Sequence, residues 1–160
     1  MNWTSGALLA AVSIATASPV VAQQWSPIYE SEGLGFFGIG EVTELDSGLK
    51  SVWMVEADPE IADGLSYTVR SIYIDCEQSV SISQTVAAYD ASDQIAGEST
   101  SEYAGEAMVG VAPTDPIPPN TIMSLYQSVA CGSARLREGP RYAEPGPMIA
   151  VYRARRDAQD

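Results

Sequence analysis

YTVRSIYIDC, residues 67–76, is the stretch that decides the fold. It is rich in β-branched and aromatic residues, which suit a pleated surface, so it is the best candidate for a central strand. The following stretch SVSISQTVAAY, residues 79–89, alternates between apolar and polar residues. A period of two is typical of a strand with one face in water. We therefore expect both stretches in one antiparallel sheet.

The alternation in residues 79–89 also predicts which side chains share a face. On one face we expect Val80, Ile82, Val86 and Ala88, with Gln84 as the exception, and on the other Ser79, Ser81, Ser83 and Thr85. The DASD that follows, residues 90–93, is typical of a hairpin turn.

Further strands are predicted on both sides of this pair, because apolar runs there are separated by turn signals. The expected order is an extended or loose start (23–33), a strand or bulged ribbon (33–45), a turn (46–48), a strand (49–56), an acidic loop (57–64) and, beyond the hairpin, two weaker strands (95–100 and 103–111).

The period of the sequence changes near its second cysteine. In NTIMSLYQSVAC, residues 120–131, the positions that recur at helical spacing are Ile122, Leu125, Tyr126 and Val129. Asn120 or Thr121 can cap this helix, and Gly132 can end it. The proline-rich connector at residues 112–119 cannot be a central strand. The sequence thus predicts an α+β fold, a small antiparallel sheet with one C-terminal helix packed on it.

The N-terminus predicts export. Residues 7–17 form an uncharged apolar run, and Val20 and Ala22 fit a signal peptidase, so we expect residues 1–22 to be a signal peptide. The run is too short to cross about 30 Å of hydrocarbon, and the alternative is a buried helix of the mature domain. No cysteine lies near Ala22, which argues against a lipid anchor. We expect a mature protein that is periplasmic or secreted.

The mature chain divides by charge into a body and an extension. The formal net charge is −13, and there is no histidine. The body, residues 23–131, carries 17 acidic residues against Lys50 and Arg70, whereas the extension, residues 132–160, carries six arginines and four acidic residues. The extension contains the linker signal EPGP, and its residues 147–156 are expected as an edge strand or a loose tail.

This charge distribution limits the partners. An acidic body repels nucleic acid and anionic lipid, so we expect neither as a partner. The acidic surface can simply keep the protein soluble, or it can attract a basic protein or a cation. The arginine-rich extension can also lie across the acidic body of its own molecule.

The two cysteines, Cys76 and Cys131, are interpreted through the predicted compartment. In an oxidising compartment a lone pair of cysteines is usually a disulfide, while the alternative is two buried free thiols. The ring closed by a bridge would contribute roughly 4 kcal/mol in the chain-entropy model. Since Cys76 ends a predicted strand and Cys131 ends the predicted helix, a bridge would pin the helix to the sheet.

Several short motifs suggest chemistry but lack its context. Residues 33–38, GLGFFG, match the dinucleotide pattern GxGxxG, yet no helix is predicted after them, and a bulged strand explains them better. Ser47 and Lys50 match S-x-x-K but lie in a turn. Asp90 and Asp93 lack the spacing of a calcium loop. Without histidine, Ser-His and Cys-His pairs and the usual zinc sites are excluded. We expect no catalytic, cofactor-binding or metal-binding residues.

The order of these elements resembles the bacterial surface-adhesin E family over residues 33–131. The segments that carry the resemblance are a tryptophan strand (51–55), a strand ending in cysteine (71–76), a strand end followed by a turn (89–94) and a proline-marked helix ending in cysteine (119–131). The resemblance implies an antiparallel sheet with a helix packed on it, the Cys76–Cys131 bridge and a non-enzymatic exported protein. The acidic body differs from the basic stretches linked to matrix adhesion in that family, so no binding residue is carried over.

The sequence therefore predicts a non-catalytic exported binding protein of the surface-adhesin E type, without a cofactor. Its partner would be a protein, basic or from a host matrix. A second hypothesis is an acidic inhibitor or chaperone-like partner of a basic envelope protein, such as a lysozyme-like enzyme. A third is a small hydrolase that uses two carboxylates.

Overall fold

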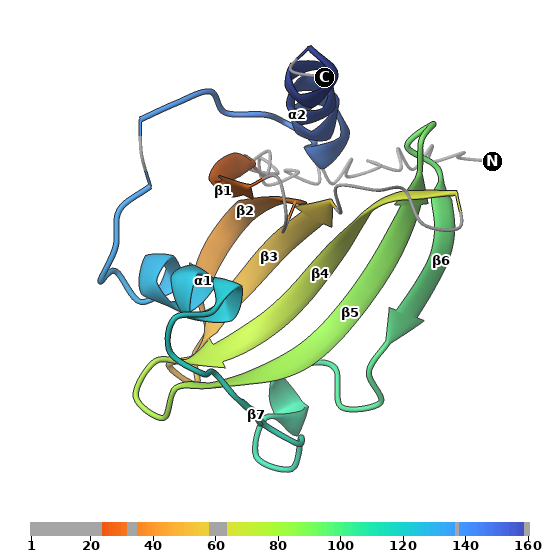
Figure 1. The fold of residues 1–160 in the computed structure, drawn as a ribbon. Coiled ribbons are helices and arrows are strands. Elements are labelled where there is room, and N and C mark those ends of the chain that lie inside the picture. Colours follow the sequence, from red (N-terminus) through yellow and green to blue (C-terminus); the bar gives the residue numbers. More distant parts are fainter. Residues whose placement is uncertain (1–23, 32–34, 58–63, 137, 159–160) are drawn as a thin grey trace, which may run out of the picture.

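One antiparallel sheet forms the centre of the fold (Figure 1). The computed structural model describes residues 24–31, 35–57, 64–136 and 138–158. Strands β1 to β6 lie side by side in chain order, and a short strand β7 pairs with β5. The strands are β1 (Ser26–Ser31), β2 (Gly35–Glu44), β3 (Lys50–Ala57), β4 (Leu65–Asp75), β5 (Val80–Asp90), β6 (Ile95–Thr100) and β7 (Asp115–Pro116).

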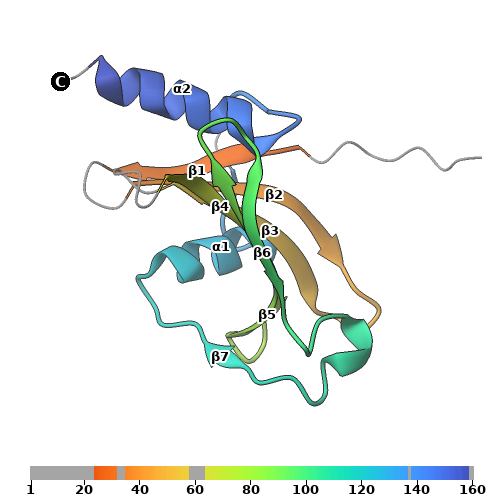
Figure 2. The same ribbon diagram turned by 90° about the vertical axis from the view of Figure 1, so that its right-hand side faces the viewer.

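Two helices cover opposite faces of this sheet (Figure 2). Helix α1 (Ile122–Ala130) lies in the hollow of the curved sheet, on what we call the α1 face, and α2 (Pro145–Asp157) lies over the α2 face. The buried core under α1 consists of Ile39, Val52, Met54, Ile72, Ile74, Ile117, Tyr126 and Ala130. The core under α2 consists of Trp25, Phe36, Val55, Ala57, Tyr67, Val69, Met148, Ile149 and Tyr152.

The predicted α+β class and the predicted central strand are confirmed. Strand β4 pairs with β3 on one side and β5 on the other. Of the two alternatives for residues 33–45, a strand or a bulged ribbon, β2 corresponds to the second, because its register with β3 shifts between Ile39 and Val42. The predicted turns are also present, and both contain residues with positive φ, Gly48 and Asp93. Residues 23–33, expected as extended or loose, contain the edge strand β1.

The predicted faces of β5 need a correction. The register with β4 shifts between the pairs Ser71–Thr85 and Ile72–Ser83, which leaves Gln84 as an extra residue. A bulge of one residue reverses the alternation that follows it. Val80 and Ile82 therefore lie on the opposite face of the sheet from Val86 and Ala88. Gln84 is buried, and its side-chain carbonyl accepts the Gly105 N–H at 2.7 Å.

The strand predicted at residues 103–111 is wrong. This segment forms turns and a short 3₁₀ helix, η1 (Glu106–Met108). Gly105 has a φ of 101°, a conformation that glycine adopts without strain but that breaks a strand. The contact of this glycine with Gln84 holds the segment beside β5.

The edge strand or loose tail predicted at residues 147–156 is also wrong, because this stretch belongs to α2. In the sequence, Pro145 and Pro147 are typical of a linker. Both lie in the first turn of the helix, where backbone N–H groups have no partner within the helix and proline is tolerated. Met148, Ile149 and Tyr152 form its buried stripe.

The predicted helix and disulfide are confirmed. Thr121 caps α1, and its hydroxyl accepts the Ser124 N–H at 3.2 Å. Gly132 follows the helix with a φ of 75°. Cys76, directly after β4, forms a disulfide with Cys131, the C-cap residue of α1. The predicted signal peptide and most of the predicted acidic loop at 57–64 lie outside the described residues.

Candidate binding groove

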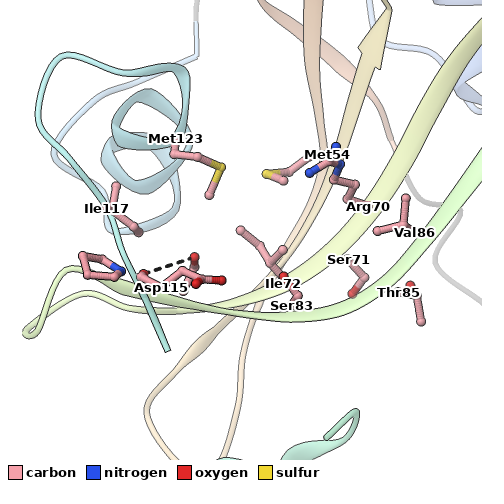
Figure 3. A pocket seen from close by; sticks show the side chains of 12 residues that line it. Met54, Arg70, Ser71, Ile72, Ser83, Thr85, Val86, Asp115, Ile117 and Met123 are labelled. Atoms are coloured by element: carbon pink, nitrogen blue, oxygen red, sulfur yellow. Dashed lines mark hydrogen bonds between the residues drawn. The ribbon is translucent and has the colours of Figure 1, made fainter. Parts of the chain in front are cut away.

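A groove lies on the α1 face between helix α1, the segment that contains β7, and strands β3 to β5 (Figure 3). Its volume is about 200 Å³. Met54 and Met123 point toward one another across it, and Ile72 rises from the sheet between them (Figure 3). Ile117 closes the side next to β7. Because methionine side chains are flexible and polarisable, such walls adapt to apolar groups of different shape.

The register of the sheet explains why these residues meet. Met54 on β3 pairs with Arg70 on β4, which pairs with Val86 on β5, so the three side chains form one row across the α1 face. Helix α1 covers only the part of that face above β2, β3 and the part of β4 that contains Ile72 and Ile74 (Figure 1). The row therefore continues from the buried core into the groove.

Two anchors fix the helix that forms the other wall. The disulfide holds the C-terminal end of α1 with a Cα–Cα distance of 5.8 Å. The hydroxyl of Tyr126 lies 3.1 Å from the carbonyl oxygens of both Gly38 and Val55, which share its single proton in a bifurcated hydrogen bond. Burial raises the pKa of Tyr126 well above the usual tyrosine value, so this hydroxyl stays protonated. The wall is thus positioned before any ligand arrives.

Arg70 is the cation at the rim of the groove. Its Nη2 lies 3.7 Å from Glu56 Oε2, which is an ion pair but longer than a hydrogen bond. The Arg70 side chain is 46% exposed. A guanidinium has five N–H donors in a planar fork that fits a carboxylate. The residues that line the groove are half apolar and half polar, and the polar ones are Arg70, Asp115, Ser71, Ser81, Ser83 and Thr85. The groove therefore combines apolar side chains with hydroxyl-bearing residues, one carboxylate and a cation that has donors available for a second anion.

A second, larger hollow of about 540 Å³ lies between β1 and the end of α1. Ile28, Leu125 and Val129 line it, and Glu30 and Arg135 border it. Glu30 already pairs with Arg155 at 3.0 Å. We consider the smaller groove the better candidate because its floor is the sheet itself.

The short sequence motifs that suggest chemistry do not meet in either hollow. Gly35 and Gly38 lie in β2, so no helix begins after them, as a dinucleotide site would need. Lys50 Nζ pairs with Glu44 at 2.5 Å, and that hydrogen bond, together with the lysine charge, lowers the pKa of Glu44. The Ser47 N–H donates to Glu106 at 2.9 Å. These residues hold the turn before β3.

Asp90 and Asp93 have roles in the hairpin between β5 and β6. Asp90 Oδ1 accepts backbone N–H groups from Ser92 and Gln94 at 2.7 and 3.0 Å. The Asp93 carboxylate hydrogen-bonds with Tyr67. Burial, followed by the charge of Asp93 and this hydrogen bond, raises the pKa of Tyr67. Within the described ranges, no three acidic or cysteine side chains are grouped as a metal site would need.

The hypothesis that the arginine-rich extension lies on the acidic body is supported by three contacts. Arg155 pairs with Glu30, the Arg153 guanidinium donates to Ser66 O at 2.6 Å, and Arg141 donates to the Ser26 hydroxyl. Only one of these contacts is an ion pair, and α2 also buries Met148, Ile149 and Tyr152.

The sequence alone does not identify the groove residues as a binding site. One signal was present: no other Lys or Arg lies between Lys50 and Arg135, and Arg70 stands in the middle of the stretch that decides the fold. A lone cation in a strand rich in β-branched and aromatic residues points to a face that is not fully buried. Met54 and Met123 gave no signal, because methionine is an ordinary core residue.

Comparisons with protein-family models, with curated proteins and with solved structures found no match to this chain. Among the described residues, no helix is both long and apolar enough to span a membrane.

Proposed function

We propose that the chain is an exported, non-catalytic binding domain of the surface-adhesin E type, and that the groove on the α1 face is its binding site. The observation that carries this proposal is the groove in which Met54, Ile72 and Met123 lie next to Arg70. The β-meander with a helix joined to it by the Cys76–Cys131 bridge is the architecture that the resemblance implies.

The groove favours a small ligand with an apolar body and an anionic group. Cavities of about 150 Å³ are large enough to take up benzene, and this groove is somewhat larger. The apolar body would contact Met54, Met123 and Ile72, while the anionic group would accept hydrogen bonds from Arg70. A charge-assisted hydrogen bond at a partly desolvated site is worth about 1.5–3 kcal/mol, which is enough to select an anion over its neutral analogue.

Fluorine NMR with para-trifluoromethylbenzoate and its neutral analogue para-trifluoromethylbenzamide tests this site. We expect the benzoate to bind more tightly to the unmodified protein, because only the benzoate can pair with Arg70. The variant R70Q should weaken benzoate binding roughly tenfold and leave benzamide binding nearly unchanged.

The matched control is R135Q, which removes an arginine at the rim of the other hollow. This variant should bind both probes as the unmodified protein does. Equal binding of benzoate to the unmodified protein and to R70Q would contradict the proposed site. A loss confined to R135Q would move the site to the hollow beside β1.

Export is tested separately. Mass spectrometry of the mature protein from its native envelope should show cleavage before Gln23 and no free thiol. An uncleaved N-terminus, or alkylation of Cys76 and Cys131 without prior reduction, would contradict the exported, bridged state.

A further inference from the structure

The two edges of the sheet differ in how they are protected. At the β1 edge, Trp25 and Tyr142 exchange backbone hydrogen bonds of 2.7 and 3.0 Å, so a connecting segment pairs with the start of the edge. Strand β1 also contains Pro27, and its register with β2 is irregular there. Proline, irregular register and covering segments are the usual means by which proteins prevent strand addition.

The β6 edge has little of this protection. All six residues of β6 are exposed, it contains no proline, lysine or arginine, and Ile95 is 58% exposed. Its register with β5 is regular from Gly97 to Thr100, and the one irregularity lies at the hairpin end. In the part of the chain that the structure describes, the outer side of β6 pairs with no other strand (Figure 1).

The hydrogen-bond pattern shows which backbone groups point outward. The Ser101 N–H donates to Gln84 O at 2.8 Å, in line with the register of β5 and β6. Ladder bonds of an antiparallel pair alternate, so every second residue of β6 faces away from β5. Glu98 and Thr100 are therefore the residues whose backbone N–H and C=O groups are directed to the outer side.

The segment that forms this edge carries charges of one sign. Residues 90–106 contain no lysine or arginine and carry five carboxylates: Asp90, Asp93, Glu98, Glu102 and Glu106. Glu98 lies on β6, and the others lie just before or just after it. A second copy of the chain, with a net charge of −13, would be repelled.

We propose that the outer edge of β6 binds an extended segment of another polypeptide that carries lysine or arginine side chains. The segment would add a strand to the sheet, with backbone hydrogen bonds to Glu98 and Thr100 providing affinity. The surrounding carboxylates select a basic sequence and accelerate its association. This surface is separate from the groove on the α1 face, and neither site depends on the other.

The probe is an end-blocked peptide of alternating lysine and threonine, about eight residues long, the length of an ordinary strand. A second peptide has the same sequence with methylated backbone nitrogens on alternate residues, so that it keeps the charge but cannot pair along one edge. We expect the first peptide to bind and to slow hydrogen exchange at the Glu98 and Thr100 amides of the unmodified protein. The methylated peptide should bind at least tenfold more weakly, a loss of roughly 1.4 kcal/mol or more.

Three variants separate charge from backbone pairing. E98Q removes a carboxylate, E98P also removes the outward N–H, and E77Q removes a carboxylate from the distant turn after β4. The affinity for the unmethylated peptide should fall slightly in E77Q, more in E98Q and most in E98P. Equal affinity for both peptides, or no added protection at Glu98 and Thr100, would overturn the proposal even if E98P folds poorly. Binding of the benzoate probe in the groove should be the same in E98Q as in the unmodified protein.

Discussion

The two faces of the sheet are covered in different ways. On the α2 face, a helix of 13 residues packs directly on the strands. The contact is so close that a Cβ on Gly38 would lie 2.5 Å from Met148 Cε and 2.9 Å from Val55 Cγ1. On the α1 face, a helix of nine residues is bonded to the sheet through Cys131, and a groove remains beside it.

This difference shows how a small domain can keep a cavity. Unfilled space under a helix lowers the free energy of unfolding, because the groups around it lose packing contacts. A covalent bridge raises that free energy by restricting the unfolded chain, whether or not the helix fills its face. We infer that the α2 face supplies the packing energy, while the bridge and Tyr126 hold α1 over a face that stays partly open.

Breaking the bridge tests this comparison most strongly. The double variant C76A/C131A should lower the free energy of unfolding by about 4 kcal/mol, since the ring is long, with a sequence separation of 55 between the cysteines. Urea unfolding measures the loss. Hydrogen exchange should speed up first in α1, and the benzoate probe should bind more weakly because a wall of the groove is loosened.

Enlarging the space under α2 should lower the free energy of unfolding without weakening ligand binding, unlike the loss of the bridge. Met148 is 1% exposed and lies in the core under α2. M148A should cost about 3 kcal/mol, within the usual range for a buried methionine replaced by alanine. Urea unfolding would show this loss, while the affinity for the benzoate probe in the folded state should stay unchanged. Weaker benzoate binding in M148A would mean that the two faces are coupled.

Alkaline pH acts on one tyrosine from each face. Burial raises the pKa of Tyr126 on the α1 face and of Tyr67 on the α2 face above the usual value, which is about 10. Above that pH the unfolded chain loses protons that the folded protein keeps, so the free energy of unfolding falls as pH rises. The slope should be at most about 1.4 kcal/mol per pH unit for each tyrosine.

Urea unfolding between about pH 8 and 11 measures this slope on both sides of the usual tyrosine pKa. Y126F and Y67F should each remove the contribution of one tyrosine to the pH dependence of the free energy of unfolding. The double variant should lose both contributions. If Y67F left the slope unchanged, the α2 face would be more open to water than its packing indicates.

Much of this architecture could be predicted from the sequence, and its two faces differ in that respect as well. The helix over the α1 face was predictable because residues 120–131 combine helical spacing with a cap and a terminal glycine. The helix over the α2 face was not, because Pro145 and Pro147 are typical of a linker, and their place in a first turn depends on tertiary packing.

The groove was harder to predict than the strands around it. It depends on register, which brings Met54, Arg70 and Val86 into one row. The bulge at Gln84 also decides that Val86 faces the groove while Ile82 does not. Neither the pairing of distant strands nor a one-residue bulge leaves a clear pattern in a single sequence, because local periodicity describes each strand by itself.

The caps of the two helices provide the mildest test. Thr121 Oγ1 accepts the Ser124 N–H, and Ser124 Oγ accepts the Thr121 N–H at 3.1 Å, so α1 begins in a capping box. Glu144, the cap of α2, makes no side-chain hydrogen bond of this kind. T121A should cost about 1 kcal/mol, and E144A less than about 0.5 kcal/mol. T121A should also weaken binding of the benzoate probe, because Met123 lies in the first turn of α1. If T121A and E144A lowered the free energy of unfolding equally, α1 would owe its position to the bridge alone.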